Sequence, residues 1–254
     1  MKTSENAFLI QARLGSTRLP TKVILPFYEG NSVLELLIDK LKDHFRGIPA
    51  ILATSTNPTN DLLEDVARKK GIYCFRGSEE DVLQRFIDAA HIFDIKQIIR
   101  VCADNPFLDM TELQRLIHFV DSNNFDYVSF KFNGLPCVKT HLGFWAEAVK
   151  LNALCKVQQM TIMLLYHEHV TNFIYENPAS FSIHFLEPND KVQNHNNIRM
   201  TLDTIEDFRN LSEIYASLRD MYGRNFGINE IIKFLDENPY YKSFMEEQIK
   251  RNVK

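Results

Sequence analysis

Residues 8–25 read Phe8-Leu-Ile-Gln-Ala-Arg13-Leu-Gly-Ser-Thr-Arg18-Leu-Pro-Thr-Lys22-Val-Ile-Leu25, an apolar run followed at once by a cationic loop. A buried strand does not carry unpaired cations, so the chain must reach the surface after Gln11. Small residues separate the cations: Gly15, Ser16 and Thr17. Small residues let backbone N–H groups approach a ligand, and fixed cations neutralise an anion. The segment therefore predicts a polyphosphate-binding loop at the carboxyl end of the first strand, where open α/β sheets bind ligands.

The spacing in this loop matches neither G-x-G-x-x-G nor the Walker fingerprint, which disfavours a dinucleotide-binding fold and a P-loop NTPase. A solvated basic loop is the alternative that the residue chemistry leaves open.

Composition bounds the class of protein. The chain has 254 residues and a net charge of -4, and its apolar and charged fractions are those of an ordinary globular protein. A nucleic-acid partner is disfavoured because such binders carry a basic excess or stripe. The four cysteines are scattered and fit small buried side chains in a reducing compartment. We find neither a signal peptide nor an apolar run of membrane-spanning length, and we expect a cytoplasmic protein without a membrane partner.

Short apolar runs alternate with amphipathic stretches in the first half. The expected strands are Ala7–Ala12, Ala50–Thr54, Ile72–Phe75, Ile98–Ala103 and Tyr127–Phe130. The expected helices are Val33–His44, Asp61–Lys70, Glu80–Phe93 and Glu112–Val120, with capping signals at Ser32-x-x-Glu35, Thr111-x-x-Gln114 and Ser78. This alternation predicts an α/β fold with a mostly parallel central sheet and helices on both faces.

The segment 131–178 interrupts the alternation, and we interpret the chain as one domain, 1–254, in which 131–178 is an inserted acceptor-side or dimerisation segment. Helices are expected at Phe144–Ala153 and Val157–Tyr166 and strands at Phe181–Leu186 and Ile198–Leu202. Helices at Ile205–Leu218 and Ile228–Leu235, with a stop at Asn238-Pro239, are expected to close the fold.

Two aspartates, Asp104 and Asp203, each follow an apolar run that we expect to form a strand. Carboxylates at strand ends would face the same crevice as the cationic loop and, with phosphate oxygens, would suit Mg²⁺ or Mn²⁺. Helix or turn capping is the alternative for each aspartate alone. Their pairing with the basic loop favours the metal site.

Arg76-Gly77-Ser78 marks a third turn on the presumed binding edge, where Gly77 permits unusual backbone angles and the helix start offers free N–H groups. Asp81 and Arg85 have i, i+4 spacing, and surface pairing is one interpretation of Arg85. His167-Glu168-His169 lacks metalloprotease spacing, so packing or capping is favoured over a metal site.

Together these segments resemble the cytidylyltransferase family of the spore-coat polysaccharide biosynthesis protein F type, related to the CMP-ulosonic and CMP-sialic acid synthetases. The matching pieces are Gln11–Val23, Ala53-Thr54-Ser55, Arg76–Arg85, Arg100-x-x-Ala-Asp104-Asn-Pro-Phe-Leu-Asp109, Glu168-His-Val-Thr171 and Arg199-Met-Thr-Leu-Asp203-Thr. They span nearly the whole chain in the family's order.

The resemblance implies a Rossmann-like nucleotide-diphospho-sugar transferase fold and transfer of CMP from CTP to a sugar hydroxyl, with Mg²⁺ and release of pyrophosphate. It implies that Arg13, Arg18 and Lys22 hold the triphosphate and that Asp104 and Asp203 bind the metal. Arg13, Lys22 and Asp104 would be catalytic. The remaining nucleotide-binding residues would be Gln11, Ala12, Gly15, Ser16, Thr17, Thr54, Arg76, Gly77 and Ser78. Relatives of this kind commonly form homodimers.

Two departures from the family pattern bear on the substrate. Thr21 stands where the family usually has glycine, and Lys139 and His141 stand where an acidic residue is expected. The second departure is compatible with an anionic acceptor and equally with a solvated loop. We expect activation of an acidic sugar for a surface polysaccharide or glycoconjugate. The alternatives are a nucleotidyltransferase for another NTP, a glycosyltransferase and a catalytically silent nucleotide-binding protein.

Overall fold

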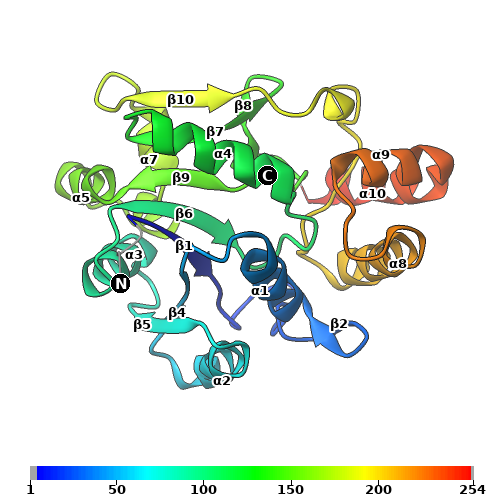
Figure 1. Ribbon diagram of the computed structural model, residues 1–254, viewed down its shortest axis with the longest axis horizontal. Coiled ribbons are helices and arrows are strands. Elements are labelled where there is room, and N and C mark those ends of the chain that lie inside the picture. Colours follow the sequence, from blue (N-terminus) through cyan, green and yellow to red (C-terminus); the bar gives the residue numbers. More distant parts are fainter. Residues whose placement is uncertain (1–4, 253–254) are drawn as a thin grey trace.

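The computed structural model describes residues 5–252 and centres on an eight-stranded sheet of order β10-β7-β9-β6-β1-β4-β5, with β8 paired to β7 (Figure 1). Its strands are β1 (Asn6–Gln11), β4 (Ala50–Ser55), β5 (Tyr73–Gly77), β6 (Gln97–Cys102), β7 (Tyr127–Phe132), β8 (Leu135–Pro136), β9 (Glu147–Lys150) and β10 (Ile183–Leu186). The pairs made by β8 and β9 are antiparallel and the others are parallel. The predicted mixed, mostly parallel α/β sheet is therefore confirmed. A separate ribbon joins β2 (Pro26–Tyr28) to β3 (Asn31–Ser32).

Helices cover both faces of this sheet. They are α1 (Val33–His44), α2 (Asp61–Lys70), α3 (Val82–Ile92), α4 (Met110–Ser122), α5 (Leu151–Met160), α6 (Leu164–Glu168), α7 (Asn172–Glu176), α8 (Ile205–Tyr222), α9 (Ile228–Glu237) and α10 (Pro239–Arg251). Side chains of β1 alternate between two apolar clusters, with Phe8 and Ile10 in the one containing α1 and α4 and Leu9 in the one containing α3 and α5. Burial on both faces explains why β1 is apolar throughout.

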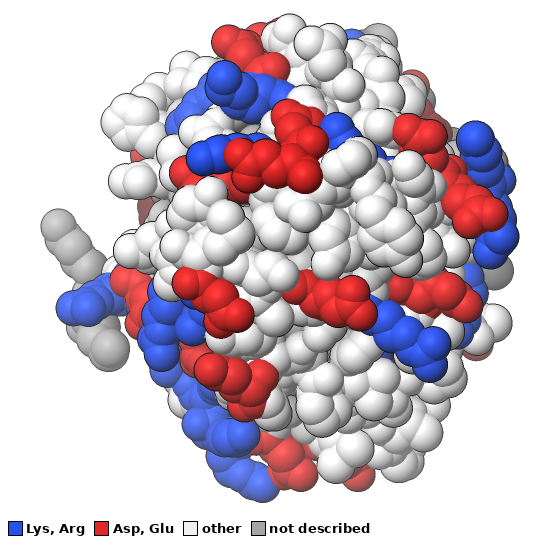
Figure 2. All heavy atoms as spheres, turned by 90° about the vertical axis from the view of Figure 1, so that its right-hand side faces the viewer, with Lys and Arg blue, Asp and Glu red and all other residues white. Residues whose placement is uncertain are grey.

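The parallel register brings strand ends to one edge. Gln11, the last residue of β1, lies opposite Ala53 of β4 and Cys102 of β6. The loops that follow these strands therefore meet at the same edge. The helices α8, α9 and α10 lie on the side toward which β1 and β6 run (Figure 1). Acidic and basic side chains are interspersed on the face seen from that side (Figure 2).

Two expectations for the second half were wrong. Within the expected helix 144–153, Glu147–Lys150 form β9 between β6 and β7, and the helix begins only at Leu151. Segment 131–178 thus supplies a strand of the central sheet. Residues 198–202 form no strand, because Met200 N–H donates to the His141 carbonyl (2.7 Å) and Leu202 N–H to the Asp104 carbonyl (3.0 Å), both in loops.

Some of the predicted helix ends also differ from those in the structure. The capping box of Ser32 and Glu35 is confirmed, but α4 is capped by Asp109, which accepts from Glu112 N–H at 2.8 Å, and not by Thr111. The expected helix 157–166 is split, since α5 ends at Met160 and α6 begins at Leu164. Pro239 does not close the fold but begins α10, because proline is tolerated at the first helical position. In residues 5–252, none of the helices combines the length and apolar character needed to cross a membrane.

Candidate active site

A cavity of about 810 Å³ lies at the edge where β1 and β6 end. The loop after β1 contributes a continuous part of its wall: Gln11, Ala12, Arg13, Ser16, Thr17, Arg18 and Lys22. Asp104 and Asp203 line the same cavity although they are far apart in the sequence. The fold thus brings the three predicted cations and the two predicted carboxylates together.

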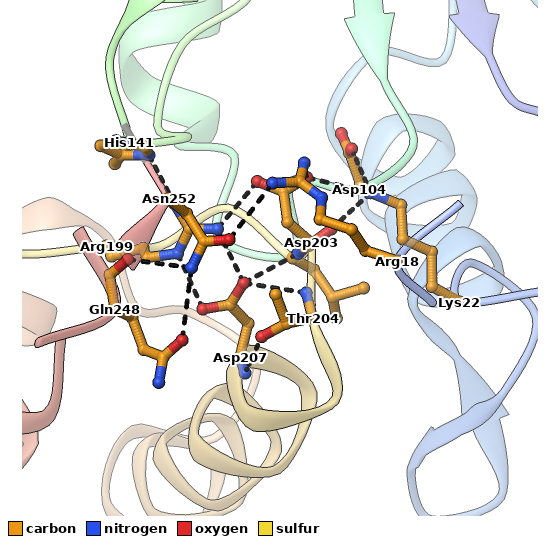
Figure 3. A network of polar contacts seen from close by, with 11 residues as sticks. Arg18, Lys22, Asp104, His141, Arg199, Asp203, Thr204, Asp207, Gln248 and Asn252 are labelled. Carbon is orange, nitrogen blue, oxygen red and sulfur yellow. Dashed lines mark hydrogen bonds and ion pairs between the residues drawn. The ribbon is translucent and has the colours of Figure 1, made fainter. Parts of the chain in front are cut away.

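Lys22 lies between the two carboxylates. Its Nζ is 2.8 Å from Asp104 Oδ2 and 3.3 Å from Asp203 Oδ1, and it also donates to the Leu202 carbonyl at 2.5 Å (Figure 3). Burial alone would lower the pKa of Lys22, but the two carboxylates outweigh burial and raise it. Lys22 is therefore a protonated, nearly buried cation at the centre of the site.

Asp203 is held from two sides. The guanidinium of Arg199, which is 1% exposed, donates to Asp203 Oδ2 at 2.9 Å, while Arg18 approaches Asp203 Oδ1 at 3.2 Å. Arg199 is itself fixed by Asp207, which accepts from its Nε at 2.8 Å and belongs to the capping box of α8 (Figure 3). No spacing rule pointed to this support, because in the sequence Asp207 has the position of an ordinary helix-capping residue.

The donor set tests whether a divalent cation fits here. Residues 5–252 contain no cluster of three or more His, Cys, Asp or Glu side chains suited to a metal. Asp104 and Asp203 are hard oxygen ligands, and Mg²⁺ accepts one or two carboxylates when phosphate and water complete its shell. The residues fit Mg²⁺ or Mn²⁺ bound together with a polyphosphate. The Lys22 ammonium contacts the same two carboxylates.

Arg13 is paired with Glu168 at 3.3 Å, and both side chains are about half exposed (47% and 49%). Exposed ion pairs contribute little stability, so a ligand anion could replace Glu168 at low cost. The neighbouring His167 donates to Asp81 Oδ2 (2.7 Å) and the Thr161 carbonyl (3.0 Å), and His169 lines the cavity. His167 thus links this segment to Asp81 at the start of α3, whereas His169 is exposed at the cavity.

Other predicted nucleotide contacts lie outside the cavity lining. Among them, Thr54 is fully buried, and Arg76 is engaged by Asp61 (2.7 Å) and Glu64 (3.1 Å). Gly15, Gly77 and Ser78 do not line the cavity either. A Cβ at Gly77 would come within 2.8 Å of the Phe75 ring, so this ring would have to move to accept any other residue there.

Arg85 does not pair with Asp81 on the helix surface, so that interpretation was wrong. Its side chain is 1% exposed, and its Nε and Nη1 have no hydrogen-bond partner within the described part of the chain. Burial, with a smaller contribution from the Arg13 cation, lowers the pKa of Arg85 to about 10. The spacing rule failed because this face of α3 is turned toward the sheet.

Lys139 and His141, the two residues of the inserted segment that depart from the family pattern, both have partners in the structure. Lys139 pairs with Glu176 at 2.8 Å and lies over the ring of Tyr175 at 5.0 Å. The Nδ1 of His141 contacts Arg199 Nη1 at 2.5 Å, so this side chain supports the Arg199 network. Only Lys139 of these two lines the cavity.

Comparison with known proteins places this site in a family. The family model described as cytidylyltransferase matches residues 7–247. The chain belongs to the cytidylyltransferase family. It is similar to the spore coat polysaccharide biosynthesis protein SpsF of Bacillus subtilis, with 33% identity over 91% of this chain and 94% of that protein. This cytidylyltransferase is thus a nucleotidyltransferase, as the sequence motifs predicted.

Solved structures agree with this assignment. A cytidylyltransferase from Leptospira borgpetersenii superposes with a TM-score of 0.83 and 28% identity over 93% of this chain and 96% of that one. A CMP:2-keto-3-deoxy-manno-octonic acid synthetase complexed with CTP has a TM-score of 0.63 and 13% identity over 84% of this chain and 99% of that one. The second likeness shows the shared Rossmann-like fold.

Proposed function

We propose that this cytidylyltransferase transfers CMP from CTP to a sugar hydroxyl, releases pyrophosphate and supplies the synthesis of a surface polysaccharide or glycoconjugate. One observation carries the proposal: Arg13, Arg18 and Lys22 of the cationic loop line one cavity together with Asp104 and Asp203. The family match supports CTP as the donor, and the name of the Bacillus subtilis relative supports the polysaccharide role. We place the reaction in the cytoplasm.

In this proposal the loop binds the triphosphate, with Arg13 and Lys22 nearest the charge that develops on transfer. The sugar hydroxyl attacks the α-phosphorus in line with the departing pyrophosphate, a reaction in which positioning and electrostatics supply most of the catalysis. Asp104 and Asp203 would hold Mg²⁺, which when bound neutralises negative charge on the phosphate oxygens. Ala12, which lines the cavity, would contact the cytidine. Thr54 and Arg76–Ser78, at the ends of β4 and β5 outside the cavity lining, are the further cytidine contacts that the family resemblance implies.

We propose an acidic sugar as the acceptor. Lys139, on the cavity wall, is 39% exposed and pairs with the half-exposed Glu176, which a carboxylate of the acceptor would replace as its partner. The synthetase that shares the fold acts, by its name, on a sugar acid. We also propose a homodimer formed through segment 131–178, which carries a run of exposed apolar side chains.

Substitution of Asp203 by Asn tests the metal assignment. The change keeps the hydrogen-bonding shape beside Arg199 but removes the charge, so Mg²⁺-dependent pyrophosphate release from CTP should fall at least about 100-fold. The assay is pyrophosphate release with a panel of ulosonic acids and sugar phosphates, and thermal shift with CTP, GTP, UTP and ATP identifies the donor. Asp220→Asn, an exposed site on α8, is the control. Full activity of Asp203→Asn would overturn the assignment.

A further inference from the structure

A buried polar network forms one side of the cavity. The carboxylate of Glu147 is 3% exposed and accepts hydrogen bonds from Arg100, from the Tyr127 hydroxyl and from Thr171 Oγ1 (3.0 Å). Burial and the adjacent Glu147 raise the pKa of Tyr127, and Glu147 also keeps Arg100 protonated. Every partner of Glu147 is therefore a hydrogen-bond donor, and the direction of each bond is defined.

The direction of these bonds sets the orientation of the Gln11 amide. Arg100 donates from Nε (3.1 Å) and Nη2 (2.9 Å) to a single atom, Gln11 Oε1. A guanidinium has only donors, so the amide must present its oxygen to Arg100 and turn its NH₂ group away. Gln11 lines the cavity, and Nε2 has no hydrogen-bond acceptor among residues 5–252.

Asn172 shows the same arrangement on the opposite end of the network. It follows Thr171 directly, and the Tyr175 hydroxyl donates to Asn172 Oδ1. Burial and the nearby Glu147 carboxylate raise the pKa of Tyr175, so the hydroxyl keeps its proton, and in the structure it donates that proton to Asn172. With Oδ1 on Tyr175, the Asn172 NH₂ group has no acceptor within the described part of the chain, and both Asn172 and Tyr175 line the cavity.

The topology separates this network from the expected cytidine contacts. It connects β1 to β6, β9 and β7, whereas Thr54 lies near the end of β4 and Arg76 near the end of β5, on the other side of β1. The charges of the network are also balanced, because Arg100 faces Glu147 and Lys139 on the rim faces Glu176. What these residues offer a ligand is therefore a pair of neutral, oriented N–H donors.

We infer that Gln11 and Asn172 bind oxygen atoms of the acceptor sugar through their amide NH₂ groups, and that Arg100 and Glu147 are positioning residues that hold the Gln11 amide in this orientation. The inference rests on the proposed function. It assigns Gln11 to the acceptor rather than to cytidine. The oxygens are those of a carboxylate or of hydroxyl groups, which share the ability to accept these hydrogen bonds.

Gln11→Glu is the decisive variant. Its carboxylate keeps an acceptor for Arg100, so the network persists, but the donor toward the cavity is lost. With the ulosonic acid or sugar phosphate of the panel that supports most pyrophosphate release, we expect the acceptor KM to rise on the order of 30-fold, while the Kd for CTP changes less than about threefold. Gln159→Glu, the same change at an exposed position of α5, should leave both constants unchanged.

Two further variants separate positioning from folding. Asn172→Asp should raise the acceptor KM in the same way. Arg100→Lys keeps the charge but loses the fork to Gln11, so it should raise the acceptor KM with little effect on the Kd for CTP. If Arg100→Lys does not fold, Gln11→Glu alone decides. An unchanged acceptor KM in Gln11→Glu, or a weakened Kd for CTP instead, would overturn the inference.

The choice of acceptor identifies the oxygen. A hydroxyl can donate to the carboxylate that Gln11→Glu introduces, whereas an acceptor carboxylate is repelled by it. The rise in KM should therefore be larger for an ulosonic acid than for its carboxyl-reduced analogue if the carboxylate is held, and similar for both if hydroxyls are held. Failure of the proposed function looks different, since the wild-type protein would then release no pyrophosphate from CTP with any acceptor.

Discussion

Thr21 adopts the left-handed backbone conformation, with φ of 58°. A β-branched residue is strained in this conformation. The strained residue closes the loop, since its N–H donates to the Leu14 carbonyl (3.0 Å) and its carbonyl accepts from Ile24 N–H (2.9 Å). The bend directly precedes Lys22 and so directs that side chain between the two aspartates.

Thr21→Gly should relieve this strain. We expect the free energy of unfolding to rise by about 1 kcal/mol, because the left-handed conformation costs a non-glycine residue about 1–2 kcal/mol and glycine loses part of this gain through its greater freedom when unfolded. Urea denaturation measures the change. Thr21→Val keeps the branched side chain and should show no stabilisation. A less stable Thr21→Gly variant would show that the conformation carries no strain.

At the scale of elements, His167 on α6 links the segment between α5 and α7 to the start of α3 through a contact with Asp81. This pair of hydrogen bonds requires a doubly protonated His167 ring, because the two ring nitrogens face two acceptors, Asp81 Oδ2 and the Thr161 carbonyl. Burial alone would lower the pKa of His167, but the Thr161 carbonyl and the Asp81 carboxylate outweigh burial and raise it. The folded state therefore binds this proton more tightly than the unfolded state does.

This linkage predicts a stability that depends on pH. The stabilisation of the folded state by these His167 hydrogen bonds should be complete below the pKa of His167 in the unfolded chain, about 6.5. It should be lost as the pH rises through the higher pKa of His167 in the folded state. We expect the free energy of unfolding to fall by about 1 kcal/mol between pH 5.5 and pH 8.5, measured by urea denaturation. His167→Gln removes the titrating group, so its profile should lack this component. Identical profiles for both proteins would contradict the prediction.

At the scale of the whole molecule, α6 and the residues before it expose an apolar patch. Its most exposed members are Ile162 (91%) and Leu164 (77%), with Met163 and Leu165 beside them. Contiguous exposed apolar side chains commonly mark a contact surface, and a two-fold homodimer would bury the same patch on both subunits.

The double change Ile162→Glu and Leu164→Glu should therefore convert a dimer to a monomer, as measured by light scattering coupled to size-exclusion chromatography. Tyr240→Glu replaces a similarly exposed side chain (74%) on α10 and should leave the dimer intact. A monomeric wild-type protein at micromolar concentration would remove the basis for this prediction.

The sequence by itself determined the elements whose signals are local. The apolar run of β1, the bounds of α1 and α2, the Ser32 capping box and the cationic loop all follow from residue types at short spacing. The motifs also determined the family and the parallel sheet, and the approach of Lys22 to Asp104 followed from where the parallel strands β1 and β6 end. Asp203 joins them from a loop, because residues 198–202 form no strand.

Only the tertiary structure decided the features that depend on distant partners. Residues 147–150 form a strand because they pair with both β6 and β7. Arg85 is buried because its face of α3 packs on the sheet. The orientation of the Gln11 amide depends on Arg100, 89 residues away, which in turn depends on Glu147. Hydrogen-bond direction is a property of assembled partners, and no spacing within one segment encodes it.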